Sequence, residues 1–282
     1  MKLQTALRLG RVSNLPTVWT NTLAGAVLAG VGGFGPEFAV MLLAFSLFYT
    51  GGMFLNDAFD AGFDAAQRPE RPIPSGEVSG REVFGWGYGM MAGGVALLAW
   101  IGVAPALAGL ALAVAITYYD WNHKENVFSP VVMGICRVLV VVGAGLCYTL
   151  APPDALWIGA ALMLCYLIGL TYVAKQENLG SVENLWPLLF LGAPVAYGAW
   201  LALAQPMVGV FWLLFSGWML VALWFLRRRA KGDIPRAVVS LIAGISLLDA
   251  LLIAGTGSVA LAVLALAGFG VTLFFQRYIA GT

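Results

Sequence analysis

The sequence predicts an all-α protein: a polytopic transmembrane bundle of nine or ten helices, organised as a single domain over residues 1–282. Hydrophobic residues make up 61% of the chain and charged residues 10%, whereas a soluble domain carries about 25% charged residues. The mean hydropathy is +0.88. Apolar stretches also recur along the chain at the roughly 17–25 residues that a helix needs to cross a bilayer. These three observations indicate a multi-pass integral membrane protein.

Ten candidate spans follow from the apolar stretches. The span at 105–119 is short, so we expect its helix to continue beyond the membrane boundary. Only Gly255, Thr256 and Gly257 separate the last two spans, which makes nine spans the alternative. The spans cover residues 15–31, 38–58, 83–103, 105–119, 130–150, 155–174, 186–204, 207–226, 236–254 and 257–276.

The first 14 residues contain Lys2, Arg8 and Arg11 and no apolar core of signal-peptide length. We therefore expect no cleaved targeting segment. Their apolar residues suit a short interfacial helix that leads into the membrane.

Basic residues fall on alternate connections between the spans. The connections near residues 32–37, 103–105, 151–154, 204–207 and 255–257 contain two acidic residues and no Lys or Arg. The other connections carry Arg68, Arg71, Arg81, Lys124, Lys175, Arg227, Arg228, Arg229, Lys231 and Arg236. The positive-inside rule puts this second set, with both termini, in the cytoplasm. We expect a bacterial inner (cytoplasmic) membrane and a polar site that faces the cytoplasm. The net charge of +1 gives no indication of a nucleic-acid partner.

Four polar side chains come together where the second span ends. Asp57, Asp60 and Asp64 follow one another at i, i+3 and i+7, and Asn56 lies one turn before Asp60, so in a helix all four share a face. Stacked carboxylates repel one another unless a cation lies between them, and Mg²⁺ is held by carboxylates together with substrate phosphates. We predict these four residues as Mg²⁺ ligands. The alternative is a solvated helix end whose acids pair with nearby arginines, although a cap needs only one or two acids.

A stiff basic loop follows the acidic residues. Arg68 and Arg71 each precede a proline, which suits a site for a metal-bridged diphosphate. The pattern N-D-x-x-D-x-x-x-D followed by R-P-x-R-P-I-P-S-G resembles the first signature of the UbiA superfamily of intramembrane prenyltransferases. The resemblance implies a UbiA-like prenyltransferase fold, Mg²⁺ as cofactor and an isoprenoid diphosphate donor of the farnesyl or geranylgeranyl class. Arg11–Asn14 also resembles an Arg-x-x-Asn element of that superfamily, so Asn14 is assigned to the substrate site.

A second polar element lies at residues 118–130. Tyr119 and Lys124 resemble the Y-x-x-x-K element of the superfamily, with a spacing one residue longer. The resemblance implies that Lys124 holds the diphosphate and takes part in catalysis, with Tyr119 beside it. His123 is interpreted as a loop or acceptor-pocket residue. Arg137, inside the next span, either reaches the phosphate or pairs with Asp249, because an intramembrane arginine needs a cavity or a partner.

The third element, residues 171–185, departs from the superfamily. A second D-x-x-x-D motif is typical of that position, but Tyr172 and Gln176 occupy it here. Lys175 is therefore predicted to supply the positive charge of a second metal ion to the diphosphate; the alternative is a topology anchor. Glu177 is a further candidate metal ligand. The altered motif, with the D-x-x-H-K-x-N-x-x-S-P loop, resembles the EboC-like branch.

Two other polar features carry no predicted chemistry. The basic run at 227–233 is typical of a topology determinant that contacts anionic membrane lipid. Cys136, Cys147 and Cys165 lie in apolar runs without zinc or disulfide spacing, and are interpreted as small buried hydrophobic residues.

Together these elements predict Mg²⁺-dependent transfer of a prenyl group to a small acceptor, a ring or a polyol. Asp57, Asp60, Asp64 and Lys124 are the candidate catalytic residues. Candidate aromatic shields for an allylic cation, or else interfacial belt residues, are Tyr118, Tyr119, Trp121 and Tyr172. A catalytically inactive lipid-binding or transport protein and an intramembrane terpene cyclase are the alternatives.

Overall fold

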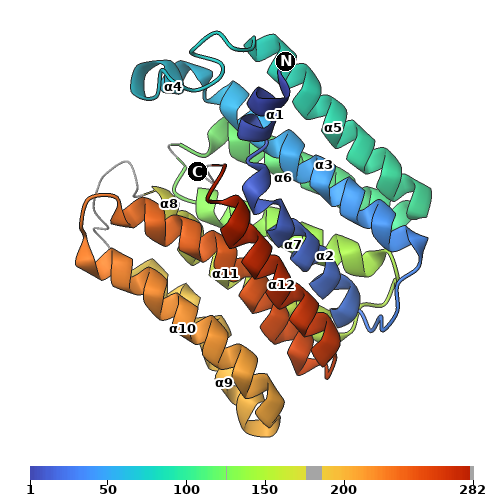
Figure 1. Ribbon diagram of the computed structural model, residues 1–282. Coiled ribbons are helices and arrows are strands. Elements are labelled where there is room, and N and C mark those ends of the chain that lie inside the picture. The colour runs from blue at the N-terminus through green and yellow to red at the C-terminus, as the bar shows by residue number, and fades with distance from the viewer. Residues whose placement is uncertain (125, 176–185, 280–282) are drawn as a thin grey trace.

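The structure, a computed structural model, describes residues 1–124, 126–175 and 186–279, and every regular element in these ranges is a helix (Figure 1). The α-helices are α1 (Leu3–Leu9), α2 (Leu15–Leu28), α3 (Pro36–Phe59), α4 (Ala61–Gln67), α5 (Gly80–Ile101), α6 (Val103–Asn122), α7 (Ser129–Leu146), α8 (Asp154–Lys175), α9 (Gly192–Ala204), α10 (Pro206–Arg228), α11 (Asp233–Gly255) and α12 (Val259–Phe275). In the same described ranges, 3₁₀ segments lie at Val12–Asn14 and Trp186–Leu191.

Each of the ten predicted spans corresponds to one of these helices. Eight are long and apolar enough to cross a membrane, counting the 3₁₀ turn together with α9, while α12 has 17 residues and α2 has 14. The short predicted span does extend beyond its predicted end, because α6 continues to Asn122. Gly257, at φ 84°, separates α11 from α12 in a conformation that favours glycine. The protein is therefore a multi-pass integral membrane protein.

Local sequence explains where several helices begin. Pro36 and Pro206 stand in the first turns of α3 and α10, where a missing N–H costs no hydrogen bond. Ser79 caps α5, since its hydroxyl accepts a hydrogen bond from the backbone N–H of Glu82 at 3.2 Å.

Helix α11 is the most buried span. In its most apolar 18-residue window 89% of the residues are buried, against 22% for α5 at the periphery. Helices α2, α8, α10 and α12 all pack against α11. Peripheral helices expose large apolar side chains such as Trp100 and Leu203, as expected for surfaces that contact lipid.

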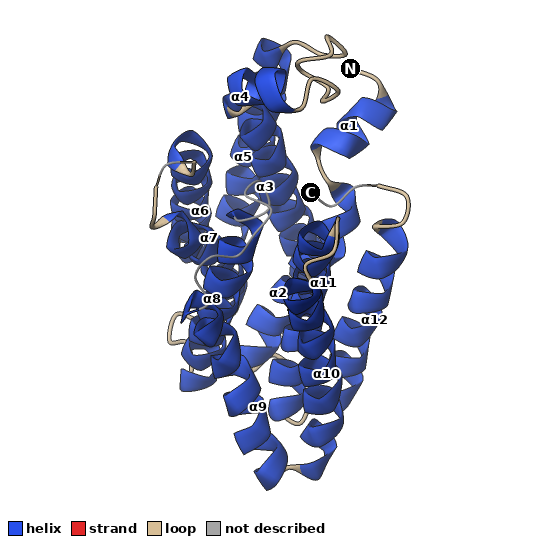
Figure 2. Cartoon of the chain, turned by 90° about the vertical axis from the view of Figure 1, so that its left-hand side faces the viewer, coloured by secondary structure: helices blue, strands red, loops and turns tan. Residues whose placement is uncertain are grey.

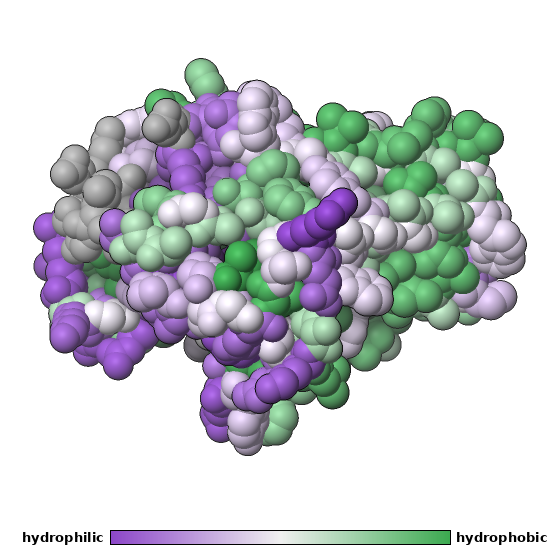
Figure 3. All heavy atoms as spheres, turned by 90° about the horizontal axis from the view of Figure 1, so that it is seen from above, coloured by the Kyte–Doolittle hydropathy of each residue, from purple (hydrophilic) through white to green (hydrophobic). Residues whose placement is uncertain are grey.

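One end of the bundle collects the polar elements. In Figure 2, α1 and α4 both lie at the upper end of the molecule. Seen from above in Figure 3, hydrophilic residues gather at this end, whereas much of the flank is hydrophobic. The candidate site lies here, at the junction of α3, α6 and α8.

Candidate active site

A cavity of about 510 Å³ opens among α2, α3, α6, α7, α8 and α11. Its wall is polar where α3, α6 and α8 end and apolar farther along the same helices. The polar lining residues are Arg11, Asn14, Tyr49, Asn56, Asp60, Arg68, Arg71, Tyr119, Asp120, His123, Lys124, Arg137, Thr171 and Lys175. Apolar lining residues include Phe45, Phe48, Leu112, Val140, Ile242 and Ile245. The cavity therefore accommodates a molecule with one charged end and one hydrophobic end.

The sequence predicts that the three aspartates lie along one uninterrupted helix. In the structure that helix is interrupted at Asp60. Helix α3 ends at Phe59 and α4 begins at Ala61, so Asp60 occupies the junction. Of the three, Asp60 lines the cavity, whereas Asp57 and Asp64 lie outside its wall.

Two arginines neutralise Asp57 and Asp64. Nη1 of Arg71 lies 3.2 Å from Oδ1 of Asp57 and 2.9 Å from Oδ2 of Asp64, and Nη2 of Arg11 lies 3.1 Å from Oδ1 of Asp57. Both carboxylates are nearly buried, at 6% and 2% exposure. Burial lowers the pKa of Arg11, but Asp57, together with Asp120 and two nearby tyrosines, more than offsets that effect and raises the pKa above its usual value. In this conformation Asp57 and Asp64 pair with arginines, as in the alternative interpretation of the sequence, but they are buried and not part of a solvated helix end.

Asp60 has different partners. Nζ of Lys124 lies 2.9 Å from Oδ1 of Asp60 and 3.8 Å from the centre of the Phe63 ring. Nε2 of His123 lies 3.6 Å from Oδ2 of Asp60, and its ring stacks on Tyr119 at 5.0 Å. Burial lowers the pKa of His123 more than Asp60 raises it, so the imidazole is neutral at pH 7. The connection between α6 and α7 thus holds a charge-neutralising lysine directly at the cavity mouth.

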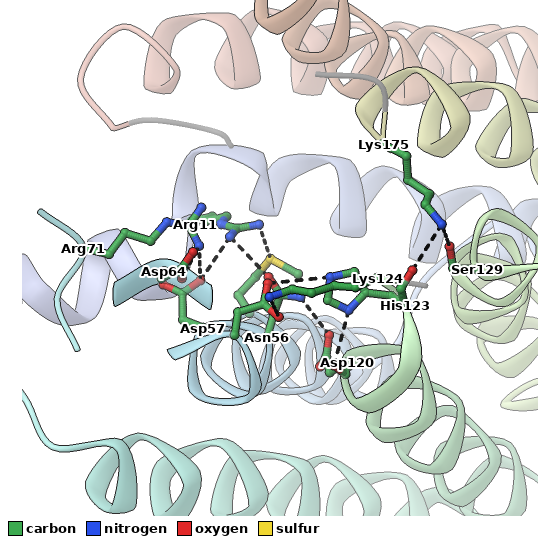
Figure 4. A network of polar contacts seen from close by, with 12 residues as sticks. Arg11, Asn56, Asp57, Asp64, Arg71, Asp120, His123, Lys124, Ser129 and Lys175 are labelled. Atoms are coloured by element: carbon green, nitrogen blue, oxygen red, sulfur yellow. Dashed lines mark hydrogen bonds and ion pairs between the residues drawn. The ribbon is translucent and has the colours of Figure 1, made fainter. Parts of the chain in front are cut away.

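Asp120 and Arg11 also belong to this cluster, although the sequence alone predicts no role for them in it. Asn56 connects them: its Nδ2 donates to Oδ1 of Asp120 at 3.1 Å, and its Oδ1 accepts from Nη2 of Arg11 at 3.3 Å. Oδ2 of Asp120 is buried without a hydrogen-bond partner. The signal available in the sequence is an acid at the polar end of a span, directly after Tyr119. Figure 4 shows both residues turned toward Asn56.

The cavity mouth has oxygen donors suited to Mg²⁺. Asn56, Asp60 and Asp120 line the cavity, and Oδ2 of Asp120 is a buried acceptor without a hydrogen-bond partner, a group that a cation would satisfy. Among the described residues, no group of three or more His, Cys, Asp or Glu side chains could hold a metal ion. The donor chemistry fits Mg²⁺, but Asp57 would reach the ion only by giving up its arginines. The predicted ligand Glu177 lies outside the described residues.

Lys175 differs from its predicted role. Its Nζ donates to the carbonyl oxygens of His123 at 3.2 Å and Asn126 at 2.8 Å, and to Oγ of Ser129 at 2.9 Å. An ammonium has three N–H donors, so these bonds use all of them. Figure 4 shows Lys175 reaching across to the start of α7. The side chain ties α8 to the connection that carries Lys124.

The remaining predicted residues divide between the cavity and the periphery. Asn14 and Arg68 line the cavity, and Oδ1 of Asn14 accepts from Nε2 of Gln276 at 2.9 Å. Among the four candidate aromatic shields only Tyr119 lines the cavity. Tyr118 and Trp121 are 43% and 69% exposed, and Tyr172 packs against the hydrophobic core.

Comparison with known proteins identifies the family. Residues 18–235 match the sequence profile of the UbiA prenyltransferase family. The chain belongs to that family. The superfamily resemblance is thereby confirmed, while the EboC-like branch stays a prediction.

Two curated relatives of this UbiA-family chain have the same name. A digeranylgeranylglyceryl phosphate synthase of Methanopyrus kandleri is 32% identical over 213 residues, which cover 70% of this chain and 71% of that protein. Another, of Metallosphaera sedula, is 31% identical over 144 residues. That match covers 50% of this chain and 51% of the relative, so the chain spans about half the length of that relative.

A solved structure confirms the fold. A UbiA homologue from Archaeoglobus fulgidus, bound to GPP and Mg²⁺, superposes with a TM-score of 0.64. The match covers 91% of this chain and 99% of that chain, at 18% sequence identity. The predicted UbiA-like fold is therefore correct.

Proposed function

We propose that this protein is a Mg²⁺-dependent prenyltransferase, acting as a single domain over residues 1–282. It transfers a prenyl group from an isoprenoid diphosphate to a small acceptor at the cytoplasmic face of the membrane. The observation that carries the proposal is the cavity, which has basic side chains at its mouth and an apolar wall deeper in the bundle. Membership of the UbiA prenyltransferase family supports it.

The diphosphate would bind at the mouth. Arg68, Arg71 and Lys124 line this part of the cavity and supply three positive charges. Arg71 and Lys124 are paired with carboxylates in this conformation, so a bound diphosphate would take over these cations. Because the leaving group gains negative charge as its bond to C1 breaks, cations fixed at this position lower the barrier.

Mg²⁺ would bind beside the diphosphate. Asn56, Asp60 and Asp120 offer oxygen donors at the cavity wall, and Asp57 and Asp64 become available if their arginines turn to the diphosphate. Bound Mg²⁺ supplies Lewis-acid stabilisation of the leaving diphosphate. The A. fulgidus homologue, described as bound to GPP and Mg²⁺, supports this assignment.

The apolar wall accounts for transfer rather than hydrolysis. Departure of diphosphate leaves an allylic cation at C1, which water would capture as readily as the acceptor. Phe45, Phe48 and Leu112 line the deeper cavity and exclude water from the chain behind C1. Tyr119 presents a ring at the polar end, where a π face stabilises a cation. The acceptor nucleophile then forms its bond to C1 and releases a proton.

The names of the two relatives suggest a first acceptor to test. A digeranylgeranylglyceryl phosphate contains two prenyl groups on a glyceryl phosphate, so a singly prenylated glyceryl phosphate is the corresponding acceptor. A hydroxylated aromatic ring or another polyol is the alternative acceptor class. Basic residues on alternate connections support a cytoplasmic orientation of the mouth.

The direct test incubates purified protein with geranylgeranyl diphosphate and candidate acceptors, with and without Mg²⁺, and measures released diphosphate and product mass. Asp60→Asn should reduce release by at least about 100-fold, as loss of a leaving-group contact does. Asp154→Asn, an exposed aspartate at the opposite end of the bundle, is the matched control. Equal diphosphate release by the native protein, Asp60→Asn and Asp154→Asn would favour a lipid-binding scaffold. A product that contains the donor carbons alone would indicate a cyclase.

A further inference from the structure

Arg137 lies in the cavity wall away from the polar mouth. It follows Ser129, the first residue of α7, by eight positions, which corresponds to about 12 Å along the helix axis. Its neighbours in the wall include Cys136 and Val140, and the ring of Tyr49 lies 5.7 Å from its guanidinium carbon. A charged group at this depth in a membrane protein is costly, and usually serves a cavity or a partner.

The sequence offers an ion pair with Asp249 as one explanation for an arginine inside the membrane, but Arg137 and Asp249 do not contact each other directly in the structure. Asn21 stands between them: Nη1 of Arg137 donates to its Oδ1 at 2.8 Å, and its Nδ2 donates to Oδ2 of Asp249 at 2.8 Å. Nη2 of Arg137 donates to Oγ1 of Thr17 at 3.1 Å. Asn21, Thr17 and Asp249 are fully buried, at 0% exposure. The buried side chains therefore fix the orientation of the guanidinium without neutralising it by contact.

The side chain of Arg137 also belongs to the cavity wall. Arg137 lines the cavity and is only partly buried, while Asn21 and Thr17 are behind it, outside the lining. The two hydrogen bonds use two of five N–H donors. The acids that line the cavity in the described part of the chain, Asp60 and Asp120, lie at the ends of α3 and α6 at the mouth. An arginine held in a cavity wall, whose linked acid Asp249 lies behind Asn21 and outside the lining, is suited to an oxyanion ligand.

We propose that Arg137 binds an oxyanion of the prenyl acceptor, a carboxylate or a phosphate, at a subsite separate from the diphosphate site. This inference rests on the proposed function. The acceptor's nucleophile then lies between Arg137 and the mouth, toward the C1 atom of the donor. The planar fork of the guanidinium suits two oxygens of one carboxylate or phosphate group.

The test compares anionic acceptors with matched neutral ones. Binding of geranylgeranylglyceryl phosphate and geranylgeranylglycerol, and of 4-hydroxybenzoate and 4-hydroxybenzamide, is measured on the purified full chain in detergent. The variants are Arg137→Gln, Arg137→Lys and the control Arg81→Gln, which removes an exposed arginine outside the cavity. Affinity for a non-hydrolysable donor analogue is measured on each variant. The two acceptor pairs distinguish a phosphate ligand from a carboxylate ligand.

Arg137→Gln should weaken binding of the anionic acceptor by roughly 10- to 100-fold, as loss of charged hydrogen bonds does, and change the neutral counterpart and the donor analogue less than about twofold. Arg137→Lys, which retains the charge and is the safer variant for folding, should give an intermediate loss. Equal losses for anionic and neutral acceptors, or weaker donor binding, would overturn the subsite. The subsite would also be overturned if the native protein bound neither anionic acceptor more tightly than its neutral counterpart. If the donor analogue still bound normally, the proposed prenyl transfer would not be affected by that result.

Discussion

Replacement of Lys175 by methionine tests whether this residue positions the cavity mouth or binds the diphosphate. Methionine keeps the length and apolar stem of the side chain and removes its three N–H donors. In the structure these donors bind His123, Asn126 and Ser129, next to the lysine that pairs with Asp60. We expect the connection between α6 and α7 to loosen.

The magnitude follows from the three hydrogen bonds. Hydrogen bonds to charged groups contribute roughly 1.5–3 kcal/mol each when shielded. Lys175 is only partly buried, so water replaces part of each contact and about 1 kcal/mol per bond is the appropriate value. Lys175→Met should therefore destabilise the connection by about 3 kcal/mol, and Ser129→Ala by about 1 kcal/mol.

Limited proteolysis of this connection and the apparent Kd for a donor analogue are measured together. Lys175→Met should increase the cleavage rate at residues 123–129 and weaken donor binding through the displaced Lys124, and Ser129→Ala should do both to a lesser extent. Lys231→Met, on the exposed basic connection after α10, serves as the control. Weaker donor binding with unchanged cleavage in Lys175→Met would refute the positioning role and restore the direct diphosphate contact predicted from the sequence.

Three further predictions concern packing, charge and pH. Gly25→Ala should lower the thermal midpoint markedly, since a Cβ there meets a backbone carbonyl of α7, an overpacking that costs roughly 1–3 kcal/mol; Gly217→Ala, where a Cβ meets open space, should be neutral or stabilising. Asp64→Asn should destabilise the detergent-solubilised protein by roughly 1.5–3 kcal/mol in a denaturant titration, because Arg71 loses one charged hydrogen bond and keeps its pair with Asp57; an unchanged midpoint would contradict the buried pair. The hydrogen bond from Thr5 is the main cause that lowers the pKa of Glu77 below its usual 4.5. The stabilisation from Glu77 is thus complete above pH 4.5 and lost as the pH falls through the lower folded-state pKa, so the native protein and Glu77→Gln should differ in thermal midpoint at pH 6 and converge at low pH.

The transmembrane helices were predictable because length and hydropathy are local properties of the chain. Each predicted span corresponds to a helix, and the uncertain boundary at 255–257 proved to be a real turn. The interruption between α3 and α4 at Asp60 was not predictable from the spacing of the aspartates. Helical backbone hydrogen bonds continue on both sides of it, with the N–H of Asp64 donating to the Asp60 carbonyl at 2.8 Å, so the local sequence pattern is that of one helix. Only a tertiary structure reveals that α3 ends there.

The composition of the site was partly predictable and its pairing was not. Asp60, Arg68, Arg71 and Lys124 line the cavity, in agreement with where the motif places polar groups. The partners come from distant parts of the chain: Arg11 lies 46 residues from Asp57, and Asn56 lies 64 residues from Asp120. Such contacts depend on how α3 packs between the N-terminal segment and α6, which no local pattern specifies.

The central claim is that Asp60 and Mg²⁺ together hold an isoprenoid diphosphate at the cavity mouth. The most direct measurement is the affinity of a thiol-linked, non-ionising geranylgeranyl diphosphate analogue, titrated with and without Mg²⁺ against the native protein, Asp60→Asn and Asp154→Asn. We predict Mg²⁺-dependent binding by the native protein and Asp154→Asn, and a loss of at least about tenfold in Asp60→Asn, equivalent to one charged contact. Binding that is equally tight in all three proteins, or unaffected by Mg²⁺, would contradict the claim.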